Sequence, residues 1–167
     1  METFRAVKLR LYPNEDQGIL LRKHVGACRF IFNYFLGKKI KHYKKTGKSL
    51  SYNETSKQMT LLKGRKQFDW LNEISYNALQ QSLRNLDTAY QNFFKQGRGF
   101  PNFKKRGIRD AFRIQNGNIS SASPFGSLRL LDSNHLQLPL IGSVKLRGSL
   151  ERLNGRLIRQ ACGVCRS

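Results

Sequence analysis

Hydrophobic and polar positions recur with two different periods along the chain. Near the N-terminus, Leu9 and Leu11 alternate with Lys8 and Arg10. A period of two residues is typical of a strand with one buried and one solvated face. The pattern therefore predicts a strand over residues 3–12 whose solvated face is cationic.

Over residues 14–96 the hydrophobic positions recur every three or four residues, as they do in amphipathic helices. Helix-capping residues precede these runs at Asn14, Ser51 and Ser75, and the first two are each followed three residues later by Gln or Glu. That spacing is the signature of a capping box. The region is therefore predicted to contain three or four helices.

Two of these helices carry clear apolar stripes. The first is predicted to run to about Lys45, with a break near Gly26, and its stripe includes Cys28, which we expect to be buried. The last is predicted from Ser75 to about Gln96. Its stripe consists of Leu79, Leu83, Leu86, Tyr90 and Phe93.

After residue 110 the period returns to two. The runs AFRIQ, GSLRLLD, HLQLPL and SVKLRG are separated by Gly, Asn, Ser and Pro, which is typical of a small antiparallel sheet or barrel. The N-terminal strand needs neighbours, because an isolated strand is unstable. We therefore expect an α+β fold with a β module from residues 1–13 and 97–160, a helical insert over 14–96 and a frayed end over 161–167.

The charge of the chain narrows its partners. Lys and Arg number 31 against 10 Asp and Glu, a formal net charge of +21, which favours a polyanionic partner. An acidic membrane surface is the alternative to nucleic acid, but no run approaches the roughly 20 apolar residues of a membrane span. The start METFRAVKLR lacks the apolar core of a signal peptide. We expect a cytoplasmic nucleic-acid-binding protein that has no membrane partner.

A basic and aromatic segment, Gly99–Ile114, is the strongest local signal for nucleic acid. It places Phe100, Phe103 and Phe112 among five cations. Lys and Arg can neutralise phosphates while aromatic rings stack on bases. The alternative is that the rings belong to the core and the cations form a solvated rim. The cations are Lys104, Lys105, Arg106, Arg109 and Arg113.

The sequence offers no catalytic constellation. Cys162 and Cys165 have the spacing of half a zinc site, but a second half is missing. The acids are scattered, and neither a nucleophile elbow nor a phosphate-binding loop occurs. We therefore predict no metal site, no cofactor and no catalytic residue in this chain.

The order of several motifs is nevertheless specific. The segments FRAVKLRLYPNEDQ, CRFIFNYFL, LSYNETSKQMTLLK, WLNEISYNALQQSLRNLDTAYQNFFK, GFPNFKKRG and LPLIGSVKL occur over about Thr3 to Arg147. In order and spacing they resemble the TnpB (OrfB) family. Those proteins are encoded by insertion sequences, were long labelled transposases, and resemble ancestors of type V CRISPR effectors.

The resemblance implies a fold and two nucleic-acid partners. The first and later strands would form a split wedge barrel resembling an oligonucleotide-binding fold, and the helices a recognition lobe. A guide RNA from the transposon end would be held through its backbone, and side chains would read a transposon-adjacent motif in double-stranded DNA. By position, the motif readers would be Tyr52, Ser56, Tyr76 and Gln80, although relatives often have Lys at the place of Tyr76. We expect the backbone contacts to come from Lys8, Arg10, Lys104, Lys105, Arg106, Arg109, Arg113, Lys145 and Arg147.

The resemblance also implies a nuclease domain, which we expect this chain to lack. Family members continue into a RuvC-like domain with three acidic ligands for Mg²⁺ and a four-cysteine Zn²⁺ ribbon, whereas this sequence ends at Ser167. We therefore expect the nucleic-acid-binding part of a TnpB-like RNA-guided DNA endonuclease, which is not an enzyme by itself. The alternatives are a nuclease-dead DNA-binding regulator and an inert truncated transposon product.

Overall fold

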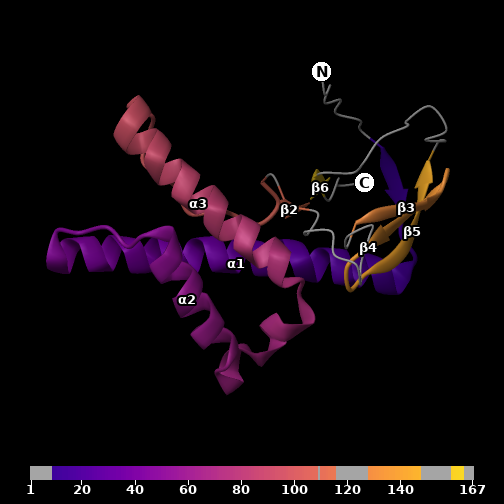
Figure 1. Cartoon of the computed structure of the whole chain (residues 1–167), viewed down its shortest axis with the longest axis horizontal. Coiled ribbons are helices and arrows are strands. Elements are labelled where there is room, and N and C mark those ends of the chain that lie inside the picture. Colours follow the sequence, from indigo (N-terminus) through magenta and orange to yellow (C-terminus); the bar gives the residue numbers. More distant parts are fainter. Residues whose placement is uncertain (1–8, 109, 116–127, 148–158, 164–167) are drawn as a thin grey trace, which may run out of the picture. The chain divides into compact units, whose positions relative to one another are not determined.

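The computed structural model describes residues 9–108, 110–115, 128–147 and the backbone of 159–163 (Figure 1). The fold class is α+β, as predicted. In chain order the elements are β1 (Arg10–Tyr12), α1 (Glu15–Thr46), α2 (Tyr52–Lys63), the 3-10 helix η1 (Lys66–Glu73), α3 (Tyr76–Gln96), β2 (Ala111–Gln115), β3 (Arg129–Asp132), β4 (His135–Leu138), β5 (Gly142–Arg147) and β6 (Arg159–Gly163).

These elements divide into two compact units. The sheet unit contains β1, β3, β4, β5 and the first turn of α1. The helical unit contains the rest of α1 together with α2, η1, α3, β2 and β6. The N-terminal strand therefore shares a unit with strands from late in the sequence, as its need for partners predicted.

The sheet unit is built on a four-stranded antiparallel sheet in the order β1-β5-β4-β3. Leu11 of β1 is opposite Leu146 of β5. One face of the sheet is apolar, and its buried side chains are Leu136, Leu138, Val144 and Leu146. The predicted closure into a barrel is not confirmed, because β1 and β3 are the two open edges of the sheet among the described strands.

The start of α1 is fixed by its own sequence and by the sheet. The Gln17 N–H donates to Asn14 Oδ1 (2.8 Å), and the Asn14 N–H donates to Gln17 Oε1 (3.1 Å). This reciprocal pair confirms the predicted cap. The Gln17 Nε2 also donates to the Ser143 carbonyl of β5 (2.7 Å). The expected break near Gly26 is wrong, because α1 continues unbroken through that residue.

The helical unit has its core where α3 crosses α1 (Figure 1). The Cys28 thiol donates to the Ala78 carbonyl (3.4 Å), and the Ser82 hydroxyl donates to the Cys28 carbonyl (2.6 Å). Each large apolar side chain buried here contributes about 1.5–3 kcal/mol relative to an exposed one. The largest fully buried side chains of this unit are Ile31, Phe35, Leu36, Met59, Leu71, Ile74, Leu79, Leu83, Leu86 and Ile114.

Strand β2 was correctly predicted as a strand, but it was assigned to the wrong layer. It pairs with β6 in a separate two-stranded sheet of the helical unit. Side-chain amides of α3 explain the placement: Asn77 Oδ1 accepts the Gln115 N–H (2.8 Å), and Gln81 Nε2 donates to Gln115 Oε1 (3.0 Å). Residues 161–163, expected to be frayed, form the end of β6.

Candidate nucleic-acid interface

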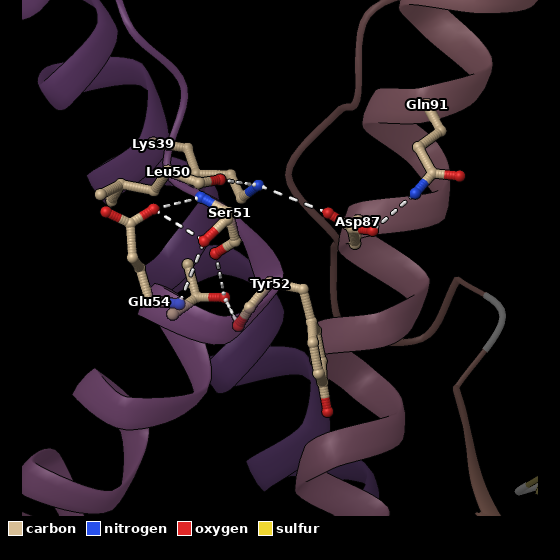
Figure 2. Close-up of polar contacts among 8 residues, drawn as sticks. Lys39, Leu50, Ser51, Tyr52, Glu54, Asp87 and Gln91 are labelled. Atoms are coloured by element: carbon tan, nitrogen blue, oxygen red, sulfur yellow. Dashed lines mark hydrogen bonds and ion pairs between the residues drawn. The ribbon is translucent and has the colours of Figure 1, made fainter.

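Helix α2 begins at a complete capping box. The Ser51 hydroxyl accepts the Glu54 N–H (3.3 Å), and the Glu54 carboxylate accepts the Ser51 N–H (2.7 Å) (Figure 2). The hydrogen bonds from the Ser51 backbone and side chain hold the pKa of Glu54 below its ordinary value. Because the box fixes the first turn, it also fixes the directions of Tyr52 and Ser56.

A buried lysine ties this start to the neighbouring helices. Lys39 of α1 is 3% exposed, and its ammonium donates to the Leu50 carbonyl (2.6 Å). The same ammonium lies 3.9 Å from the Asp87 carboxylate of α3 (Figure 2) and 4.7 Å from the centroid of the Tyr90 ring. Burial lowers the pKa of Lys39, and Asp87 and then Glu54 partly offset that shift. One side chain thus links α1, the residue before the cap of α2, and α3.

The start of α3 is held differently from the prediction. Ser75 occupies the N-cap position, but its side chain makes no capping hydrogen bond. Its backbone N–H instead donates to Nε2 of the fully buried His24 (3.1 Å). A side chain of α1 therefore satisfies one of the backbone donors at this helix start. The first exposed side chain of α3 is that of Tyr76.

Two of the predicted motif-reading residues, Ser56 and Gln80, lie near the hydroxyl of a third, Tyr76. Thr60 Oγ1 lies 3.4 Å from this oxygen. The pKa of Tyr76 is lowered, first by its hydrogen bond with Thr60 and further by those with Ser56 and Gln80 and by the charge of Lys63. The Lys63 ammonium lies 5.2 Å from the Tyr76 ring centroid. Tyr76 is still 40% exposed, so the cluster faces solvent.

The fourth predicted residue, Tyr52, lies one turn before Ser56 on α2. Its side chain reaches alongside α3 (Figure 2), where the Arg84 guanidinium lies 4.8 Å from its ring centroid. Both tyrosines thus carry a cation over the ring. We call this surface the α2–α3 polar face, and its members are Tyr52, Ser56, Thr60, Lys63, Tyr76, Gln80 and Arg84.

A second group of predicted residues gathers in the sheet unit. Arg10 of β1 is directly opposite Arg147 of β5, and Tyr12 is opposite Lys145. Residues directly opposite in antiparallel strands share a face. Arg129 of β3 joins this face, because its partner Gln137 is itself opposite Ser143. We call this surface the sheet cationic face, with Arg10, Tyr12, Arg129, Lys145 and Arg147 as its members, all of them exposed.

For the aromatic rings of the basic segment after α3, the sequence left two alternatives, base stacking or burial in the core. Phe112 is buried, whereas Phe100 and Phe103 are exposed. The cations Lys104, Lys105, Arg106 and Arg113 are exposed. Two other predicted backbone-contacting cations, Lys8 and Arg109, lie outside the described residues.

Sequence reasoning missed several members of both faces. Arg129 stands in an alternating run, so its period already placed it on the solvated face. Thr60 and Lys63 continue the helical face of Ser56 at i+4 and i+7, and Arg84 continues that of Gln80 at i+4. The signal was present as helical spacing. What was missing was the pairing of α2 with α3.

The described part of the chain contains neither a candidate metal cluster nor a candidate membrane-spanning helix. In residues 9–108, 110–115 and 128–147, no group of three or more His, Cys, Asp or Glu side chains could hold a metal ion. None of the helices described is both long and apolar enough to cross a membrane.

Comparisons with known proteins place the chain. Residues 1–48 match a helix-turn-helix domain model of the OrfB IS605 type. The structure has one unbroken helix, α1, over residues 15–46 of that region. The sequence is 31% identical over 166 residues to the putative RNA-guided DNA endonuclease InsQ of Escherichia coli K12, covering 98% of this chain and 39% of InsQ.

Two further relatives match shorter stretches. A putative RNA-guided DNA endonuclease of Streptomyces pristinaespiralis is 32% identical over 126 residues, which cover 71% of this chain and 31% of that protein. The virulence protein VsdF of Salmonella dublin is 35% identical over 111 residues, which cover 61% of this chain and 93% of VsdF. The chain thus spans less than half the length of either endonuclease relative. Together with the matched domain, these relatives show that the chain belongs to the TnpB/OrfB family and corresponds to the N-terminal portion of its members.

Proposed function

We propose that this chain is the nucleic-acid-binding N-terminal portion of a TnpB-like RNA-guided DNA endonuclease, and that its α2–α3 polar face reads a short DNA motif. The observation that carries the proposal is the cluster at the Tyr76 hydroxyl. Thr60 of α2 lies 3.4 Å from it, and Ser56 of α2 and Gln80 of α3 lie near enough to lower its pKa, although these two residues are 24 positions apart in the sequence. Side chains that the family resemblance names separately therefore form one group, in which Tyr76 is exposed and Ser56 and Gln80 are half-buried.

The chemistry of this face suits base edges flanked by phosphates. The Gln80 amide offers a donor and an acceptor, the pair that recognises an adenine edge in the major groove. Lys63 and Arg84 supply positive charge at either tyrosine ring, and cations of this kind fix register through phosphates. The contact of Thr60 with the Tyr76 hydroxyl and the cations over both tyrosine rings hold these side chains in place before DNA arrives, which reduces the ordering required on binding.

The sheet cationic face would hold the nucleic-acid backbone. Arg10 and Arg147 stand directly opposite each other, an arrangement that destabilises a sheet unless a polyanion lies across the pair. We propose that this face and the basic segment around Lys105 contact phosphates of the guide RNA from the transposon end and of the target DNA. The strands of the sheet unit would then act as the wedge module of the family.

Cleavage is assigned to a part of the relatives that this chain does not match. The chain covers 39% of InsQ and 31% of the Streptomyces relative. Hydrolysis of DNA by a two-metal mechanism needs a cluster of acidic ligands, and we propose no catalytic residue, metal or cofactor for residues 1–167. The chain alone would then bind without cutting, whether it serves a larger nuclease or acts as a nuclease-dead regulator.

The decisive experiment measures motif preference in a Gln80→Ala variant. We expect a loss of about 1–3 kcal/mol at one motif position, because one bidentate base contact disappears, while affinity for unrelated DNA stays nearly the same. The measurement is competition binding on randomised duplexes in the presence of the RNA that co-purifies with the protein. Gln91→Ala on the same helix is the matched control, because Gln91 bonds Asp87 and lies outside the polar face. An unchanged preference in both Gln80→Ala and Tyr52→Ala would refute motif reading by this face.

A further inference from the structure

The loop Lys104–Ile108, which carries three of the predicted backbone cations, contains a defined turn. The Ile108 N–H points to the Lys105 carbonyl at 3.4 Å, and Gly107 has φ 80°. A positive φ at the third position is the mark of a type II turn, where glycine is strongly preferred. Lys105 and Arg106, the first two turn residues, are both exposed.

Asn33 of α1 fixes the residue that leads into this turn. Its Nδ2 donates to the Lys104 carbonyl (2.9 Å), and its Oδ1 accepts the Lys104 N–H (2.8 Å). One side-chain amide therefore satisfies both backbone polar groups of Lys104, as a neighbouring strand would. The Lys104 ammonium in turn lies 4.3 Å from the centroid of the Phe32 ring on α1.

Asp110 fixes the other end of the turn. Its Oδ2 accepts the Gly107 N–H (2.9 Å), and its Oδ1 accepts from the Arg29 guanidinium of α1 (2.8 Å). Arg29 and Asp110 are both largely buried, with 23% and 22% of their side chains exposed. The carboxylate is therefore engaged with Arg29, and among the described ion pairs it has none with Lys105 or Arg106.

We infer that Lys105 and Arg106 form a preorganised seat for a backbone phosphate of nucleic acid, and that Asn33 and Asp110 are the positioning residues that hold it ready. The inference rests on the proposed function, since it assigns a second contact to the same partner. A loop fastened at both ends to α1 has already lost most of its conformational freedom. Binding then orders fewer side chains, and the affinity rises accordingly.

The first test is an Asn33→Leu variant, which removes both bonds to Lys104 without changing any charge. We expect about 10-fold weaker binding to a short duplex DNA, because the turn must be ordered at the moment of binding. The dependence of log K on log salt should keep its slope, since the same phosphates are neutralised in the complex. A Lys105→Ala variant should instead flatten that slope by about 0.9, because it deletes one phosphate contact. Equal affinity of Asn33→Leu and the wild type for both duplex DNA and single-stranded RNA, or a flattened slope in Asn33→Leu, would overturn the inference.

The second readout needs no nucleic acid. Trypsin cuts after Lys104, Lys105 and Arg106 only when the loop can open, so Asn33→Leu should be cleaved there at least several-fold faster than the wild type. Asn85→Leu, at an exposed position of α3, is the matched control and should be cleaved at the wild-type rate. Equal cleavage rates in wild type and Asn33→Leu would show that Asn33 does not hold the loop.

The outcomes separate the two ideas. If the wild type binds neither duplex DNA nor single-stranded RNA, the proposed function fails and the phosphate seat fails with it. If the wild type binds and Asn33→Leu binds equally well, only the seat fails. If the effect of Asn33→Leu appears with RNA and not with duplex DNA, the seat belongs to the guide strand.

Discussion

The two candidate surfaces differ in how their polar groups are satisfied. On the sheet cationic face, Arg10 and Arg147 stand opposite each other, and within the described residues neither forms an ion pair. On the α2–α3 polar face, the Tyr76 hydroxyl lies 3.4 Å from Thr60 Oγ1, and Ser56 and Gln80 lie near enough to lower its pKa. Charges without a partner gain from any phosphate, whereas bonded groups gain only from a ligand that replaces their bonds. The first surface suits affinity and the second suits selectivity.

The interiors of the two units also differ in how many polar side chains they bury. In the sheet unit the described buried side chains are apolar, whereas the helical unit also buries His24, Lys39, Thr55, Ser75, Gln81 and Ser82. Thr55 bonds only within the start of α2, and the other five take part in hydrogen bonds between separate segments of the chain. Such bonds fix the relative positions of α1, α2 and α3, which a selective surface requires.

Removing Lys39 should have the largest effect, because this side chain bonds across the interior of the helical unit and the sheet unit buries no such group among its described residues. We expect Lys39→Ala to lower the free energy of unfolding by about 3 kcal/mol, because it leaves a cavity and a buried Leu50 carbonyl without its donor. The measurement is urea denaturation at neutral pH. Lys41→Ala, at an exposed position of α1, is the matched control and should change stability by less than about 0.5 kcal/mol. Equal effects of the two substitutions would mean that the buried lysine does not tie the helices together.

The elements that the sequence predicted well depend on neighbours three or four positions away. The Asn14–Gln17 and Ser51–Glu54 caps and the stripe of α3 were predicted correctly because the interacting residues lie within one or two helical turns. The burial of Phe112 and the exposure of Phe103 were not separable. Each ring is directly followed by a basic residue, Lys104 or Arg113, and only the packing of β2 against α3 and β6 distinguishes them.

The candidate site was predictable to a smaller extent. The resemblance placed Tyr52, Ser56, Tyr76 and Gln80 as separate positions, but the sequence does not say that α2 and α3 face each other at those turns. That arrangement depends on long-range contacts such as Lys39 with Leu50 and Asp87. The predicted closure into a barrel is not confirmed, for a related reason. Period-two alternation identifies a strand but not its partner, and β2 found its partner in β6.

The burial of Cys28 in the helical unit makes the stability of the protein depend on pH. Burial raises the pKa of Cys28 from 9.0 to about 12, against a smaller opposing effect of Lys104. Above pH 9 the unfolded thiol ionises while the folded thiol stays protonated, so the unfolded state binds fewer protons and stability falls as pH rises. We expect this group to contribute a loss of about 1.4 kcal/mol per pH unit between about pH 9 and 12.

The measurement for Cys28 is the difference between wild type and Cys28→Ala. Both proteins share every other titrating group, so the gap between their unfolding free energies isolates this thiol. As the pH is raised from 8 to 10, the unfolding free energy of the wild type should fall relative to that of Cys28→Ala. Parallel pH profiles for the two proteins would show that the Cys28 thiol ionises as readily in the folded state as in the unfolded state. Burial in the helical unit would then not exclude water from this thiol.

The smallest effect on stability is expected on the sheet cationic face, where it should have the opposite sign. Replacing Arg10 and Arg147 together by Gln removes two like charges that face each other, so we expect the unfolding free energy to rise by up to about 0.5 kcal/mol. Nucleic-acid binding should nevertheless weaken, and its salt dependence should flatten by about 1.8, since two phosphate contacts disappear. The control is Lys44→Gln with Lys45→Gln, at the exposed end of α1, which removes the same net charge. If the control flattens the salt dependence equally, total charge governs binding, and the opposed arginines are no more than part of a general positive field. If the double arginine variant is instead less stable, contacts within the fold stabilise the two arginines. The polar groups of the sheet cationic face would then be satisfied within the protein, as those of the α2–α3 polar face are.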